Sequence, residues 1–170
     1  GIGAGGGIGK VMGDWVIDGH PSGDIWECDV RRHHPVQREQ AHIEARIPEA
    51  LGHTYAMHWP FYQYKTARDR IQSPLHQVLK DQGACFGEVA GYGRPNWYAQ
   101  GGAKAEYEYS YKRQNWFEFY ASEHRSMRES VGIYDISSFG KFEVSGPDAE
   151  KALQWLCCGD VSAEPGALIY

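Results

Sequence analysis

Glycines crowd the start of the chain in a pattern that could bind a phosphate. Gly1-Ile2-Gly3-Ala4-Gly5-Gly6 fits G-x-G-x-x-G, and Asp24 follows about 20 residues later, the spacing of a dinucleotide-binding fingerprint. That fingerprint follows a strand and opens a βαβ unit, whereas only one plausible strand comes after these glycines. The pattern therefore favours a glycine-rich loop whose backbone approaches some other ligand, with a merely flexible stretch as the remaining alternative. Backbone N–H groups ahead of a helix suit an anionic or carbonyl-bearing ligand.

Histidine, serine and cysteine show no catalytic or metal-binding spacing. The eight histidines form no HExxH pattern, so solvated or core histidines are favoured over a metal site. The run Ser137-Ser138-Phe139-Gly140 lacks the G-x-S-x-G elbow of a serine nucleophile. Neither a disulfide framework nor a zinc site is indicated by the positions of the cysteines, which are Cys28, Cys85, Cys157 and Cys158. We interpret them as reduced, mostly buried thiols in a reducing compartment.

Two aromatic runs could form a stacking surface. They are Arg94-Pro95-Asn96-Trp97-Tyr98 and Arg113-Gln114-Asn115-Trp116-Phe117. Such a surface could hold a planar ligand or could be buried by packing, and packing is the more common use of clustered aromatic residues.

Composition excludes several classes of protein. The chain has 170 residues, of which 42% are hydrophobic and 23% charged, so a disordered chain, a collagen-like repeat and a disulfide-stapled miniprotein are poor interpretations. The net charge is −5 and the basic residues are scattered, which argues against nucleic acid as a partner. No apolar run reaches the roughly 18 residues of a membrane span, and no signal peptide is visible. We expect a soluble protein that is not exported.

Helices and strands are expected to mix without strict alternation, which indicates the α+β class. Apolar spacing, capping residues and turn residues predict helices over residues 10–18, 36–46, 74–82 and 122–131 and after Gly146-Pro147-Asp148. Alternating or short apolar runs predict strands over residues 24–30, 54–59, 84–90, 133–136, 141–144 and 167–170. Residues 91–102 hold four glycines, a proline and an asparagine, so a surface linker is expected there.

The chain resembles the dimethylglycine and sarcosine dehydrogenase family. The resemblance is carried, in order, by GIGAGGGIGKVMGDWVIDG, DIWECDVRR, YAMHWP, SPLH, GACFGEVAGYGRPNWY, YSYKRQNWF, EHRSMRESVGIYDISSFGKFEVSGPDAE and DVSAEPGALIY. Members of this family are FAD-dependent amine oxidoreductases with a C-terminal folate-binding domain similar to the glycine-cleavage aminomethyltransferase. The match extends over essentially the whole chain.

This resemblance implies that the chain is an internal fragment of a longer protein. Residues 1–30 would be the C-terminal tail of the FAD domain and residues 31–90 the small central domain of the family. Residues 91–170 would be the truncated N-terminal part of the folate-binding domain. The family's own dinucleotide fingerprint and its catalytic residues would then lie outside this sequence, so the G-x-G-x-x-G match at Gly1 would be coincidental.

The resemblance also suggests residues that contact cofactors. Gly1, Ile2 and Gly3 match a loop that passes close to the flavin ring of FAD, and Gly6 belongs to the glycines that let the next helix approach. Backbone N–H groups at that place would stabilise negative charge on a reduced flavin. On the folate side, Phe139 matches a position that lines the pterin pocket for tetrahydrofolate. No metal ligand is implied.

The function implied by the resemblance is the oxidative demethylation of an N-methylated glycine by FAD, with one-carbon transfer to tetrahydrofolate. The fragment alone is expected to be inactive and to bind no FAD. A folate-binding transfer module without redox activity and an inert connector between two active domains are the alternatives. The expected partner is a small N-methylated amine, with no nucleic acid and no membrane span. The compartment would be the bacterial cytoplasm or the mitochondrial matrix.

Overall fold

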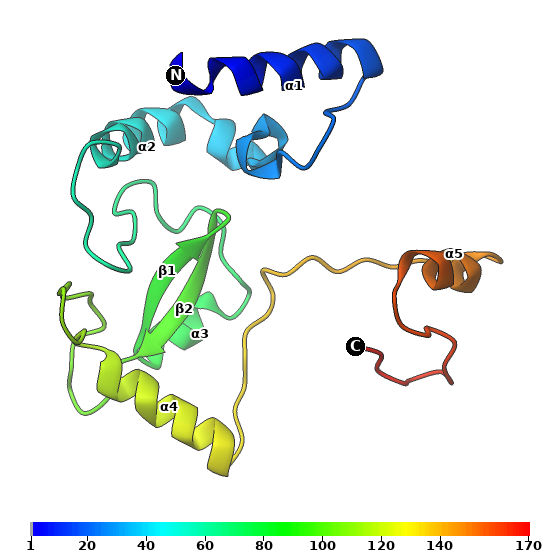
Figure 1. Ribbon diagram of the computed structural model, residues 1–170. Coiled ribbons are helices and arrows are strands. Elements are labelled where there is room, and N and C mark those ends of the chain that lie inside the picture. The colour runs from blue at the N-terminus through cyan, green and yellow to red at the C-terminus, as the bar shows by residue number, and fades with distance from the viewer. Residues whose placement is uncertain (1) are drawn as a thin grey trace. The chain divides into compact units, whose positions relative to one another are not determined.

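The computed structural model describes residues 2–170, which form two compact units that divide between Asp135 and Ile136. The first unit contains α1 (Gly5–Asp18), α2 (Gln40–His53), α3 (His76–Asp81), β1 (Ala84–Val89), β2 (Tyr92–Tyr98) and α4 (Phe117–Glu129), and the second contains α5 (Ala149–Leu156) (Figure 1). Short 3₁₀ helices occupy Ile2–Ala4, Trp26–Cys28, Val30–Arg32 and Pro35–Arg38. The predicted α+β class is confirmed.

An antiparallel hairpin of β1 and β2 lies at the centre of the first unit (Figure 1). Its turn has positive φ at Ala90 (49°) and Gly91 (85°), the geometry that matches the twist of the two strands. The prediction of β1 is confirmed, but the prediction of a linker over residues 91–102 is wrong because β2 occupies Tyr92–Tyr98. Pro95 is accommodated next to a bulge at Cys85/Phe86, where the register of the ladder shifts.

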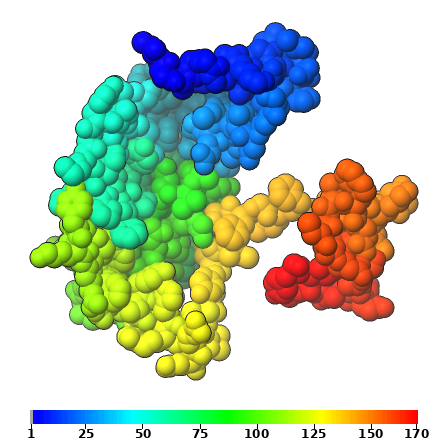
Figure 2. Space-filling view, in the orientation of Figure 1, coloured from blue at the N-terminus to red at the C-terminus, as the bar shows by residue number. Residues whose placement is uncertain are grey.

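Trp97 of β2 anchors the core, with 1% of its surface exposed. Its ring stacks on Phe119 of α4, with centroids 5.5 Å apart, and on Trp116, with centroids 6.4 Å apart. Glu123 of α4 also accepts a hydrogen bond from the backbone N of Tyr98 at 2.9 Å. The two aromatic runs therefore serve packing, as the commoner alternative predicted. Figure 2 shows the atoms around the hairpin and α4 as one closely packed body.

Helix α2 runs through Pro48, although the sequence predicted that this proline ends a helix or begins another. Proline removes one backbone hydrogen bond, which ordinarily breaks a helix. Here side chains on either side of the proline hold α2 to the loop that follows it. Arg46 Nη2 donates to the carbonyl O of Thr66 at 2.8 Å, and Glu49 accepts from the backbone N of the same residue at 2.8 Å.

Three further predicted helices are present with shifted ends. Helix α1 ends at Gly19, whose φ of 76° is the left-handed cap conformation, but it begins at Gly5 instead of at residue 10. Helix α3 is confined to His76–Asp81, and α4 begins at Phe117, before the predicted Ser122 cap. Helix α5 follows Gly146-Pro147-Asp148 as predicted.

Five predicted strands are wrong, namely those over residues 24–30, 54–59, 133–136, 141–144 and 167–170, where the structure has short 3₁₀ helices, turns, bends and irregular chain. In the first of these, Asp24 Oδ1 accepts from the backbone N of Trp26 at 3.0 Å and Asp29 Oδ1 accepts from that of Arg31 at 2.8 Å. Such local bonds from aspartate to the backbone favour turns over an extended chain. No helix within residues 2–170 is long and apolar enough to cross a bilayer.

Candidate functional site

Three of the residues predicted to approach FAD, Ile2, Gly3 and Gly6, are exposed. Gly1 lies outside the described residues, Ile2 and Gly3 belong to the first 3₁₀ turn, and Gly6 lies in the first turn of α1. A Cβ added at Gly3 or Gly6 would meet no atom within 4 Å. The loop expected over residues 1–9 is wrong from Gly5 onward, because those glycines are helical. The described residues of this segment do not enclose a flavin.

Phe139, predicted to line a pterin pocket, lies in a turn of the second unit. Its backbone N donates to the carbonyl O of Ile136 at 3.0 Å, and its ring is half-exposed. Lys141 closes the same turn, because its Nζ donates to the carbonyl O atoms of Ile136 and Ser137 at 2.8 and 3.0 Å. The structure has this turn, closed by the Lys141 hydrogen bonds, in place of the two strands expected over residues 133–136 and 141–144.

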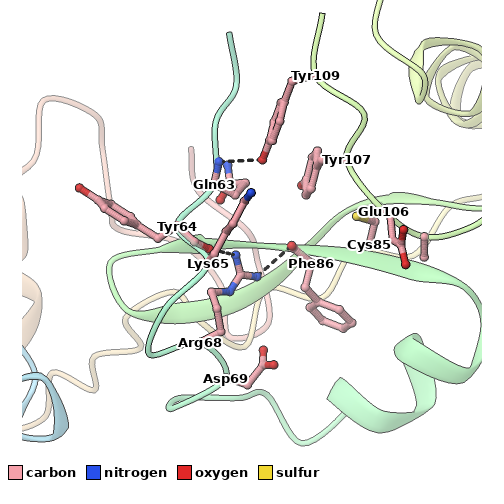
Figure 3. Close-up of a pocket in the computed structure, with 11 residues that line it drawn as sticks. Gln63, Tyr64, Lys65, Arg68, Asp69, Cys85, Phe86, Glu106, Tyr107 and Tyr109 are labelled. Atoms are coloured by element: carbon pink, nitrogen blue, oxygen red, sulfur yellow. Dashed lines mark hydrogen bonds between the residues drawn. The ribbon is translucent and has the colours of Figure 1, made fainter. Parts of the chain in front are cut away.

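A hollow of about 450 Å³ lies within the first unit and joins three parts of the chain (Figure 3). The loop after α2 forms one wall, β1 forms another, and residues 105–109 form the third. Its lining residues are Gln63, Tyr64, Lys65, Arg68, Asp69, Cys85, Phe86, Ala105, Glu106, Tyr107 and Tyr109. Sequence reasoning predicted none of them as site residues.

Arg68 and Gln63 attach the loop wall to the outer edge of β1. Arg68 donates from Nη1 to the carbonyl O of Tyr64 at 3.0 Å and from Nη2 to that of Phe86 at 2.9 Å. Gln63 Oε1 accepts from the backbone N of Glu88 at 2.9 Å. These side chains satisfy backbone groups that an edge strand leaves unpaired, so the loop is held without forming a third strand.

Gly87 makes this close attachment possible. A Cβ at Gly87 would lie 2.2 Å from Asn96 Nδ2 and 2.8 Å from Gln63 Oε1. Any larger residue would therefore push the loop wall away from β1. Gly87 is the sequence signal that could have pointed to the hollow, because a glycine inside a strand often marks close approach by another group.

The third wall is aromatic and fixed by hydrogen bonds. The rings of Tyr107 and Tyr109 are nearly parallel, 6° apart, with centroids separated by 5.6 Å. Asn96 Nδ2 donates to the Tyr107 hydroxyl at 2.8 Å, and the Tyr109 hydroxyl accepts from the backbone N of Gln63 at 3.0 Å. Burial raises the pKa of Tyr107, so its hydroxyl stays neutral at physiological pH.

Cys85 lines the hollow as an unreactive thiol. Burial raises its pKa to about 11, so almost no thiolate forms near pH 7. All four cysteines are free thiols, but only Cys85 is buried, and the other three are exposed. The expectation of mostly buried thiols is therefore wrong. Within residues 2–170, no group of three or more histidine, cysteine, aspartate or glutamate side chains is placed to hold a metal ion.

Glu49 of α2 holds the loop wall in place from its other side. Its carboxylate accepts hydrogen bonds from the backbone N atoms of Lys65 and Thr66, from the Thr66 hydroxyl and from the Tyr62 hydroxyl, at 2.5 to 2.8 Å. Burial alone would raise the pKa of this carboxyl, but the four donors outweigh it and lower the pKa to about 2.

We expect Glu49→Gln to lower the free energy of unfolding at pH 7 by about 2 kcal/mol, because an amide accepts weaker hydrogen bonds and brings an N–H₂ group towards these donors. The ordinary pKa is 4.5 and the folded pKa is about 2. The stabilisation is therefore complete above pH 4.5 and is lost as the pH falls from 4.5 towards 2. Urea unfolding of both proteins across this range measures the difference. If the difference between the two proteins is the same at about pH 6, above this window, as at about pH 2.5, near its lower end, the role given to Glu49 is contradicted.

Two family models match consecutive parts of the chain. Residues 18–73 match the family model described as FAD dependent oxidoreductase central domain. Residues 75–170, more than half of the chain, match the model described as GCVT N-terminal domain. The chain belongs to the FAD-dependent oxidoreductases in which this central domain precedes a GCVT N-terminal domain.

Relatives in this oxidoreductase family are similar over almost the whole chain. A 4-methylaminobutanoate oxidase (formaldehyde-forming) from Paenarthrobacter nicotinovorans is 45% identical over 96% of the chain. The mitochondrial pyruvate dehydrogenase phosphatase regulatory subunit of Mus musculus is 31% identical over 100% of it, and the mitochondrial sarcosine dehydrogenase of Mus musculus is 30% identical over 98%. The chain spans only about a fifth of the length of these curated relatives, 20%, 20% and 21% respectively.

Proposed function

We propose that this chain works as part of an FAD-dependent enzyme that oxidises an N-methylated amine and passes the one-carbon unit to tetrahydrofolate. The observation that carries the proposal is the order of the two family matches, with the central domain at 18–73 directly followed by the GCVT N-terminal domain at 75–170. Two of the relatives named above are an oxidase and a dehydrogenase of N-methylated amino acids by name.

The substrate we propose is an N-methylated amino acid. Dimethylglycine and sarcosine follow from the sequence resemblance, and 4-methylaminobutanoate is the substrate named for the relative that is 45% identical. All three carry a methylated amine and a carboxylate. The compartment we propose is the bacterial cytoplasm or the mitochondrial matrix.

Within this enzyme we propose three parts, namely residues 1–30 as the tail of the FAD domain, 31–90 as the central domain and 91–170 as the start of the folate domain. Gly1, Ile2, Gly3 and Gly6 would approach the flavin, and Phe139 would approach the pterin. Both proposals come from the resemblance of the sequence to the family.

A second candidate is a protein of this architecture without redox activity. The regulatory subunit of the pyruvate dehydrogenase phosphatase matches the entire chain, so this architecture also occurs in a protein named for regulation. A folate-binding transfer module without its own redox reaction belongs to the same class of alternative.

The test compares this chain with the polypeptide encoded by the whole reading frame around it. We expect the chain alone to lose FAD on desalting, because the described residues near its start enclose no flavin, and the whole polypeptide to retain a flavin absorbance band. A yellow chain after desalting would contradict the division into parts. A whole polypeptide that is colourless but binds tetrahydrofolate would favour the second candidate.

A further inference from the structure

The hollow of the first unit carries one cation that is free to bind a ligand. Lys65 Nζ makes no hydrogen bond or ion pair among the contacts of residues 2–170, and Figure 3 shows its side chain extending towards the tyrosine wall. Its backbone N is held by Glu49 at 2.8 Å, so the stem of the side chain starts from a fixed place. The ammonium group has three donors and no partner for them.

Arg68 adds a second cation to the lining of the hollow, and hydrogen bonds orient its guanidinium group. Two of its five N–H donors bind the carbonyl O atoms of Tyr64 and Phe86, which fixes the plane of the guanidinium and leaves the others available. The acids of the hollow, Asp69 and Glu106, lie at its margins in Figure 3, on the far side of Arg68 and next to Cys85. Lys65 and Arg68 are the two cations among the residues that line the hollow, so an anionic ligand would bind on their part of it.

The rest of the lining suits a flat, apolar body. Tyr107 and Tyr109 present nearly parallel rings, and Phe86 is held by stacking on His76, with centroids 4.1 Å apart. Aromatic walls with a few placed polar groups are typical of small-molecule sites, and about 450 Å³ lies within the usual range of about 300–1,000 Å³ for such sites.

We propose that this hollow binds a small aromatic carboxylate, with the carboxylate on Lys65 and Arg68 and the ring against Tyr107 and Tyr109. Two charge-assisted hydrogen bonds hold the anionic group, and edge-to-face contact with the tyrosine rings, which already stack on each other, holds the ring of the ligand. The proposal does not depend on the proposed function, because none of the lining residues belongs to the predicted FAD or folate positions.

The test is an NMR titration of the chain with benzoate, with benzamide as the neutral probe of the same shape. We expect benzoate to bind at least about tenfold more tightly than benzamide, a factor equivalent to about 1.4 kcal/mol. Lys65→Met should remove most of that preference and leave the weak binding of benzamide unchanged. The matched control is Lys104→Met, which removes an exposed lysine that does not line the hollow.

Three results would overturn the proposal. They are equal affinities for benzoate and benzamide, equal effects of Lys65→Met and Lys104→Met, and the absence of any shift in the Tyr107 and Tyr109 resonances at saturating benzoate. Far-ultraviolet circular dichroism of both variants controls for folding, because Lys65 is exposed and keeps its backbone bond to Glu49.

Discussion

Trp97→Ala is expected to lower the free energy of unfolding of the first unit by about 4 kcal/mol, because deleting a buried tryptophan removes its transfer free energy and leaves a cavity. Trp97 is 1% exposed and stacks on both Phe119 and Trp116. The loss would separate α4 from the hairpin. Urea denaturation, followed by circular dichroism and by the fluorescence of the remaining tryptophans, measures the change.

Trp155→Ala is the matched control for this substitution. Trp155 lies on α5 and is 85% exposed, so we expect its removal to change the free energy of unfolding by less than about 0.5 kcal/mol. Similar losses for the two substitutions would show that the hairpin and α4 do not share a core built on Trp97.

Arg46→Met is expected to lower the free energy of unfolding by about 3 kcal/mol, because it leaves the carboxylate of Glu88 with little solvent and no counter-charge. The two side chains are only 13% and 12% exposed. Arg46 binds both oxygens of Glu88, at 3.0 and 2.9 Å, and its guanidinium lies 4.3 Å from the centre of the Tyr64 ring. The pair joins α2 to β1.

The exposed pair Arg113–Glu118 provides the matched control for this prediction. Its length is 3.0 Å, but its side chains are 66% and 70% exposed, so Arg113→Met should cost no more than about 1 kcal/mol. We also expect the double substitution Arg46→Met, Glu88→Met to recover part of the stability lost in the single variant, since it removes the unpaired charge. Equal effects at the buried and the exposed pair, measured by urea denaturation, would contradict the role given to Arg46.

Helices were predictable from the sequence where local residues set their limits. Gly19 ends α1 because it adopts the left-handed conformation, and Gly146-Pro147-Asp148 precedes α5. Strands were harder, because a strand needs a partner that sequence spacing does not show. The run over residues 24–30 alternates like a strand, yet Asp24 and Asp29 bind the backbone locally and bend it into turns. Conversely, the glycines and the proline of residues 91–98 suggested a loop, but the buried Trp97 and the turn at Ala90 and Gly91 make it a strand.

The hollow could not be predicted for a related reason. Its lining comes from three separate parts of the chain, and the contacts that join them are between side chains and backbone. In the sequence Arg68 looks like an ordinary surface arginine, because the carbonyl O of Phe86 that it binds belongs to β1, a separate part of the chain. The family, in contrast, was recognisable from ordered motifs along the whole chain, and the matches at 18–73 and 75–170 confirm that recognition.

The most direct test of the proposed function is anaerobic reduction of the flavin in the polypeptide encoded by the whole reading frame. On addition of 4-methylaminobutanoate, sarcosine or dimethylglycine, we expect one of the three to bleach the visible flavin band. With tetrahydrofolate present, the released one-carbon unit should appear as methylenetetrahydrofolate instead of free formaldehyde. A flavin band that none of these N-methylated amines bleaches, or a polypeptide that holds no flavin, would contradict the assignment to amine oxidation.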